Sequence, residues 1–464
     1  MSGSFTSLNT ALSALRYNRV AMDVASGNIA NVGTEGYVRR RVSAEAVGAP
    51  AQPAMWSRYD GAGEGVAVSG VDRLADALLD VRARREHGNQ SYLDVRQSVL
   101  ERVETGIGEP GDNGVAAAIA DFRSAWHDLA NNPGSDAARA QVLGRASTLA
   151  DALRIQSRNV DAESGDLRMR ALGDVAEVNT VASDLAATNK SIAIAHLNGT
   201  DAGVLLDKRD QLALRLSELT GSTATLRADG GFDVSVNGVP LVTGKDAGTL
   251  QITSGITPTG ASDGAPIGYA VTGGSGTTAV PSGLTGELGG VTDLLTTTLP
   301  AYAAGLDAVA KQLADEVNAQ HQAGYDAAGN PGQPLFGYDP ADPAGSLAVA
   351  LTAPGQVAAS SVPGGGLDAG NATALATATG VEDSYQRLVN GFGTEVASVK
   401  RLAANQQVLT SQVDGSREQL SGVSLDEEMV TMLSSQRAYE AAARVMTTVD
   451  SVLDTLINRT GLVR

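Results

Sequence analysis

A glycine pattern at residues 106–111 could do cofactor chemistry. GIGEPG matches the G-x-G-x-x-G pattern with which many proteins hold a dinucleotide. That use needs a buried strand directly before the glycines, so that the pyrophosphate meets the start of the following helix. Here the preceding residues place Val95, Val99 and Val103 at helical spacing. The pattern therefore predicts a turn between two helices, with nucleotide binding as the alternative.

Histidines and acidic loops are the next candidates for chemistry. The four histidines lie far apart in the sequence, and no zinc-protease, serine-hydrolase or P-loop pattern occurs. The run DAAGNPGQP, which begins at Asp326, shares only its first acidic residue with a calcium loop and is interpreted as a turn. The sequence therefore predicts no catalytic residue, no metal ligand and no cofactor.

Three consecutive arginines, Arg39 to Arg41, follow the stretch SGNIANVGTEGYV. They could form an arm that binds nucleic acid. The chain carries a formal net charge of −18, however, and such a charge opposes binding to nucleic acid or to an anionic membrane. We therefore expect these arginines to pair with carboxylates of the same chain.

The composition limits the class of protein. A chain of 464 residues is too long for one core, and size alone suggests about three domains. Cysteine is absent, which excludes disulfides and thiolate chemistry. The first thirty residues lack the apolar core of a Sec signal, so export would need another route; they also have the acid-poor, amphipathic character of a mitochondrial transit peptide. No apolar run is long enough to predict a membrane span.

The hydrophobic pattern predicts a mainly α fold with an inserted β domain. Residues 91–219 have helical spacing almost throughout, with a long segment from about 137 to 196 that we expect to be interrupted. Alternating apolar residues and an Asn237-Gly238 turn then predict a small β domain up to about residue 283. Helical spacing returns after residue 288, and residues 324–370 are rich in turns.

Both ends of the chain have the spacing of a coiled-coil seam. Apolar residues recur at alternating intervals of three and four, which is typical of a helix that needs a helical partner. The seam positions are Leu8, Leu12, Leu15, Met22 and Ile29 near the N-terminus, and Met432, Tyr439, Met446 and Leu453 near the C-terminus. We expect these two helices to pair with each other, with other subunits, or with both.

The two ends resemble the flagellar axial proteins of the rod, hook and hook-junction type. The resemblance lies in SLNTALSALRYNRVAMDVASGNIANVGTEGYVRRR and in SLDEEMVTMLSSQRAYEAAARVMTTVDSVLDTLIN. The family motif covers Asn28, Ile29, Ala30, Asn31, Gly36 and Tyr37, and this chain has Glu35 where the family usually has proline. The interior, including LLDKRDQLALRLSELTG, is similar to the hook-associated branch at the hook–filament junction.

The resemblance implies a structural adaptor and not an enzyme. It implies an inner domain of paired terminal helices at residues 1–38 and 424–464, and an elongated helical middle domain at 39–220 and 284–423. A β-rich outer domain would occupy residues 221–283.

It also implies secretion by the flagellar type III apparatus and a location at the hook–filament junction of the bacterial flagellum. The implied partners are hook subunits, a second junction protein on the filament side, a ring of copies of this chain, and an export chaperone. A rod or hook subunit is the alternative function, and an enzyme that uses residues 106–111 is a further one.

Overall fold

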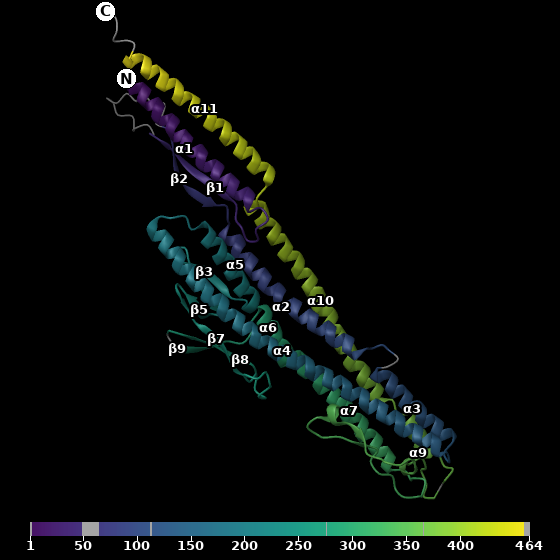
Figure 1. Ribbon diagram of the computed structural model, residues 1–464. Coiled ribbons are helices and arrows are strands. Elements are labelled where there is room, and N and C mark those ends of the chain that lie inside the picture. The colour runs from purple at the N-terminus through teal and green to yellow at the C-terminus, as the bar shows by residue number, and fades with distance from the viewer. Residues whose placement is uncertain (1, 49–64, 112–113, 275, 365, 459–464) are drawn as a thin grey trace, which may run out of the picture.

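The molecule is long and narrow, and the two ends of the chain lie together at one tip (Figure 1). The computed structural model describes residues 2–48, 65–111, 114–274, 276–364 and 366–458. Helices run along the length of the molecule, and small antiparallel sheets lie against them. The predicted fold class, mainly α with a smaller β part, is confirmed.

The terminal helices lie side by side. Helix α1 (Ser2–Ala30) packs along helix α11 (Leu425–Asn458) at the tip of the molecule (Figure 1). A hairpin of strands β1 (Arg40–Val47) and β2 (Gly65–Arg73) packs on another side of α1. This hairpin was not predicted from the sequence.

Long helices form the body. Helix α2 (Ala77–Ile107) runs beside α10 (Gly380–Ser421), and α4 (Asp136–Asn198) packs against α3 (Val115–Asn131) and α5 (Gly203–Thr220). Helix α6 (Gly286–Asp293) continues through a π-helical turn, Leu294–Thr298, into α7 (Leu299–Gln322).

The expected interruptions in α4 are wrong, because its 63 residues form one helix. The helix contains several glycines, among them Gly144, Gly165 and Gly173, which have low intrinsic helix propensity. A glycine inside a helix costs only about 1 kcal/mol relative to alanine. Packing against other helices and strands along its length keeps α4 continuous.

Seven strands occupy the region between α5 and α6. One sheet contains four strands, β3 (Thr223–Leu226), β4 (Phe232–Val236), β5 (Val239–Thr243) and β6 (Asp246–Ala247). A second contains β7 (Thr249–Ser254), β8 (Gly268–Gly273) and β9 (Gly276–Val280). The predicted turn between β4 and β5 is confirmed, with φ of 46° at Asn237 and 85° at Gly238.

The strands share a core with the helices. Phe232, Val234 and Val236 alternate toward the interior and belong to the same apolar cluster as Leu216 of α5 and Val178 of α4. A domain boundary at residue 221 would therefore divide one continuous core. The division into three domains remains a proposal.

A second apolar cluster fills the end of the molecule far from the termini. It joins α3, the first part of α4, α7 and the start of α10 to the turn-rich segment. That segment contains only short elements, which are β10 (Phe336–Gly337), α8 (Pro343–Ser346), β11 (Ala348–Val349), a 3-10 turn at Pro354–Gln356 and α9 (Gly370–Ala376).

His321 connects α7 to this segment and is fully buried. Its Nδ1 donates to the carbonyl of Gln333 at 2.5 Å, and its Nε2 accepts from the backbone N–H of Ala358 at 2.8 Å. Burial lowers the pKa of this imidazole to about 4, although the Gln333 carbonyl opposes the shift. The neutral ring is therefore the form that the fold requires.

We expect His321 to make this protein sensitive to acid. The unfolded chain takes up a proton near pH 6.5 and the folded one near pH 4, so stability present above pH 6.5 is lost as the pH falls between these values. The loss amounts to about 3 kcal/mol. Urea unfolding of the wild type and of His321→Gln at pH 7.5 and pH 4 measures it. An equal loss of stability in both proteins would contradict this role.

Candidate functional site

Polar side chains gather where the terminal helices meet the body. We call this cluster the joint; it consists of Asn28, Tyr37, Arg39, Arg40, Arg73, Asp207, Asp210, Glu427 and Glu428. Its members come from α1, the chain after it, the hairpin, α5 and α11. Three separated parts of the sequence therefore meet in one network.

Asn28 occupies the centre of the joint and is only 1% exposed. Its amide nitrogen donates to the carbonyl of Arg40 at 2.9 Å and to Glu428 at 3.0 Å. Its amide oxygen accepts from the Tyr37 hydroxyl at 2.9 Å and from the Arg40 backbone N–H at 3.0 Å. Asparagine suits this position because a buried amide offers two donors and an acceptor oxygen in one plane.

We expect Asn28→Ala to lower the free energy of unfolding by about 2 to 3 kcal/mol, because the Arg40 N–H and the Tyr37 hydroxyl lose their acceptor. Hydrogen exchange of the amides in α1, compared with Asn31→Ala, measures the effect. The hydrogen bonds of the Asn31 side chain are local: its amide nitrogen donates to the carbonyl of Gly27, and its amide oxygen accepts from the Thr34 hydroxyl. Equal protection of α1 in the two variants would contradict the role of Asn28.

Arg39 ties the chain after α1 to the start of α11. Its guanidinium lies 2.7 Å from Glu428 and 2.7 Å from Glu427. Both acids belong to the first turn of α11, where negative charge also stabilises the helix dipole. The Arg39 backbone N–H donates to the carbonyl of Ser421, so the joint also holds the end of α10.

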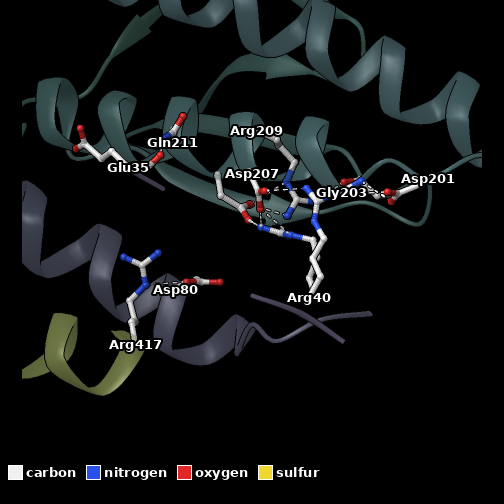
Figure 2. A network of polar contacts seen from close by, with 12 residues as sticks. Glu35, Arg40, Asp80, Asp201, Gly203, Asp207, Arg209, Gln211 and Arg417 are labelled. Atoms are coloured by element: carbon white, nitrogen blue, oxygen red, sulfur yellow. Dashed lines mark hydrogen bonds and ion pairs between the residues drawn. The ribbon is translucent and has the colours of Figure 1, made fainter. Parts of the chain in front are cut away.

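Arg40 and Arg73 connect the hairpin to α5 by sharing Asp207. The distances are 3.2 Å from Arg40 and 2.7 Å from Arg73, and Arg73 also lies 2.8 Å from Asp210. Figure 2 shows Arg40 reaching Asp207 on α5, with Asp201 at the edge of the network. Burial works to lower the pKa of Arg73, but Asp210 and Asp207 outweigh it and raise the pKa.

Arg209 extends the network from α5 to the strands. It lies 2.6 Å from Asp210, and its guanidinium stacks 3.9 Å from the centre of the Phe232 ring. It also donates to the carbonyl of Gly230. The joint is therefore continuous with the interior of the body.

The turn before the arginines contacts α5 through its backbone. The Glu35 carbonyl accepts from the side-chain amide of Gln211, and the Glu35 side chain is exposed (Figure 2). Gly36 has a φ of +73°, and a Cβ there would collide with Gln211. This position therefore requires glycine, whereas position 35 contributes only its backbone to the contact.

The arginines pair with carboxylates, as predicted, at Arg39 and Arg40. Arg41 is exposed. The run of arginines predicted that the partners would be carboxylates. It did not identify Asp207 and Asp210 as those partners, or Arg73 as a further member of the joint, because no local pattern marks these residues.

The predicted seam residues have intermediate burial on both terminal helices. This group comprises Leu8, Leu12, Leu15, Met22 and Ile29 on α1 and Met432, Met446 and Leu453 on α11, while Tyr439 is 38% exposed. Of the remaining motif residues, Ala30 is exposed and Asn31 is half-buried. Their part in assembly stays a prediction.

Apart from Asn28 and Glu428 of the joint, the buried side chains on the described parts of these helices are small. The group comprises Ala11, Asn18, Ala21 and Ala25 on α1 and Ser435 and Ala442 on α11. Small residues let two helix backbones approach closely. The seam prediction missed these residues because it was based on large apolar side chains. The signal that could have found them is the seven-residue spacing of small side chains, as at Ala11, Asn18 and Ala25.

Part of α11 has apolar side chains without cover. Leu425, Met429 and Leu433 follow one another at intervals of four and are 46%, 47% and 50% exposed. Val430 is 67% exposed. Exposed apolar side chains that follow one another along a helix make a candidate contact surface.

The glycine turn joins α2 to α3, as predicted. Gly108 ends α2 with a φ of 67°, and no strand precedes it. The carboxylate of Glu109 accepts from the backbone N–H of Ala116 at the start of α3 and from the hydroxyl of Tyr385. The context for dinucleotide binding is therefore missing.

Across the described part of the chain, no group of three or more His, Asp or Glu side chains is arranged to hold a metal ion. Within that part, no helix has the length and apolar character needed to cross a membrane. The joint is a set of paired charges suited to holding two parts of the molecule together.

Comparison with known proteins gives three family matches. Residues 100–336 match the helical domain of flagellar hook-associated protein FlgK. Residues 8–37 match the flagella basal body rod protein model, and residues 418–459 match the C-terminal model of the flagellar basal body rod FlgEFG proteins.

Whole proteins match over nearly their full length. Flagellar hook-associated protein 1 of Bacillus subtilis is 28% identical, with 100% of this chain and 99% of that protein covered. The protein of the same name from Escherichia coli is 24% identical, with 97% and 99% covered. The solved structure of the hook junction protein FlgK from Burkholderia pseudomallei has the same fold, with a TM-score of 0.64 at 18% identity over 73% of this chain and 100% of that chain.

Proposed function

The chain belongs to the flagellar hook-associated protein FlgK family, and from this membership we infer that it is the structural adaptor between the hook and the filament of a bacterial flagellum. The match of residues 100–336 to the FlgK helical domain carries this conclusion. The terminal matches alone would also fit a rod subunit, since both models are named for basal body rod proteins.

We propose that the terminal helices form the part of the subunit that assembles into the axial structure. The pairing of α1 with α11, and the uncovered apolar side chains of α11, support this role. The body would then project from the axis, held at its angle by the joint.

The finer partners are proposals as well. They are hook subunits on one side, a second junction protein on the filament side, copies of this chain in a ring, and an export chaperone before assembly. We also propose that the subunit is exported through the flagellar type III apparatus. We propose further that it has no catalytic activity.

Deletion of the gene tests the function. We expect cells with hooks but no filaments, and filament subunits released into the medium. Intact filaments on the deletion strain would refute the junction role, and missing hooks would favour the rod or hook alternative.

A further inference from the structure

A large groove lies beside the glycine turn, between α10 and the adjoining ends of α2 and α3. Its volume is about 1050 Å³. Ile107, Tyr385 and Phe392, all at least nine-tenths buried, form its apolar floor. This volume lies at the upper end of the range of small-molecule pockets and is large enough to hold side chains of a protein segment.

The groove is lined by charges of both signs. Glu104 and Glu109 line it from the end of α2 and the turn that follows. Lys400 and Arg401 line it from α10. An occupant that matches this groove needs an apolar centre, basic groups that meet Glu104 and Glu109, and acidic groups that meet Lys400 and Arg401.

Helix α4 exposes a face with that pattern. Ile155, Ala162 and Met169 recur every seven residues, so they share one side of the helix, which we call the α4 ridge. Ile155 is 49% exposed and Met169 is 56% exposed. Helical geometry places Arg158 along one edge of the ridge and Asp166 along the other.

The ridge and the groove lie at the same level of the molecule but point in different directions. Gln156, the neighbour of Ile155, donates inward to the carbonyl of Ile107 at 3.2 Å and to the Tyr385 hydroxyl at 2.7 Å. Ile155 faces solvent on another side of α4. The α4 ridge of a copy therefore cannot enter the groove of the same copy. The ridge of a neighbouring copy that lies at the same level can.

We propose that the α4 ridge of one copy of this chain occupies the groove of the next, as a lateral contact within the assembled junction. Arg158 then faces Glu104 and Glu109, and Asp166 faces Lys400. Because ridge and groove are different surfaces, the contact is head to tail, which generates closed rings or helices and not isolated pairs. The proposal rests on the proposed function, because only an assembled junction places copies side by side.

Zero-length carbodiimide cross-linking of wild-type flagella, followed by mass spectrometry, tests the contact without any substitution. Lys400 lies 3.2 Å from Glu101 of its own copy, which supplies an internal reference cross-link. We expect a second cross-link, from Lys400 to Asp166 of a neighbour. Recovery of the Glu101 product alone from filament-bearing flagella would overturn the proposal.

Engineered cysteines give an independent test, because the wild-type chain has none. Oxidation of flagella that carry Ile155→Cys with Asn390→Cys, the latter in the groove, should produce a ladder of covalent multimers. A matched pair joins Ile155→Cys to Val408→Cys, which is 67% exposed and does not line the groove. The groove pair should give at least about tenfold more covalent multimer than this control pair, because bound neighbours raise the effective concentration of the thiols.

Charge exchange distinguishes the contact from chance proximity. Arg158→Glu and Glu104→Arg should each reduce the cysteine ladder, and the two together should restore it. No ladder from flagella with normal filaments overturns the lateral contact and leaves the junction function intact. Hook–filament preparations that lack this chain altogether overturn the function, and the contact with it.

Discussion

Replacing Asp207 by alanine should lower the free energy of unfolding by about 3 to 5 kcal/mol. Asp207 is 8% exposed and pairs with Arg40 and Arg73, which are almost as deeply buried. Without it, Arg40 keeps only a distant pair with Asp201 at 3.8 Å. Arg73 keeps Asp210, so the cost falls mainly on Arg40, a largely buried cation whose remaining partner is 3.8 Å away.

Urea unfolding of the purified variants measures this effect, with Asp201→Ala as the matched control. The Asp201 side chain is 64% exposed and also accepts from the backbone N–H of Gly203, so its removal should lower stability by about 1 kcal/mol. Asp207→Asn keeps the shape of the side chain but not its charge, so its stability should lie between those of Asp207→Ala and Asp201→Ala. Equal stability of Asp207→Ala and Asp201→Ala would contradict the importance of the shared carboxylate.

The same change should also affect the flagellum. The hairpin is anchored to α5 through these pairs, so Asp207→Ala should free the terminal helices from their orientation on the body. We expect exported subunit and fewer attached filaments in cells that carry it. Asp201→Ala cells should have normal filaments.

Met446→Asp should abolish filament attachment while leaving export normal. Met446 lies in the half-buried row of α11 that includes Met432 and Leu453. A carboxylate there loses the apolar contact of the methionine and is partly desolvated, a cost of at least about 2 kcal/mol for the α1–α11 pair. The helix pair would then open at the tip where the subunit assembles.

Microscopy of filaments and immunoblotting of the culture medium separate assembly from export. Thr447→Asp is the control, because the neighbouring Thr447 is exposed and an added carboxylate there remains in water. Normal filaments with Met446→Asp would refute the seam hypothesis. Loss of filaments in both variants would show that charge on α11, and not the seam, is responsible.

Regular local patterns made much of the fold predictable. Three-and-four spacing indicated the terminal helices, and alternation with Asn237-Gly238 indicated the hairpin of β4 and β5, because a repeating pattern reports which face of an element is buried. The hairpin of β1 and β2 escaped prediction. Its strands are mostly half-buried or exposed on both faces, so the short alternation at Val42, Ala44 and Ala46 does not mark a buried face.

The joint shows the limit of sequence reasoning most clearly. The run Arg39 to Arg41 in an acidic chain predicted ion pairs, and the motif around Asn28 indicated the family. The sequence could not identify the carboxylates that pair with these arginines, because Asp207 lies 167 residues from Arg40 and Glu428 lies 389 residues from Arg39.

The sequence alone therefore determined the kinds of element, the charged character of the turn after the first helix, and the family of axial proteins. Tertiary structure decided that α1 lies between α11 and a hairpin, and that Asp207 joins two arginines. Element type follows from neighbours within a few residues, which the sequence displays directly. A buried ion pair depends on how distant segments pack, and only the folded chain brings those segments together.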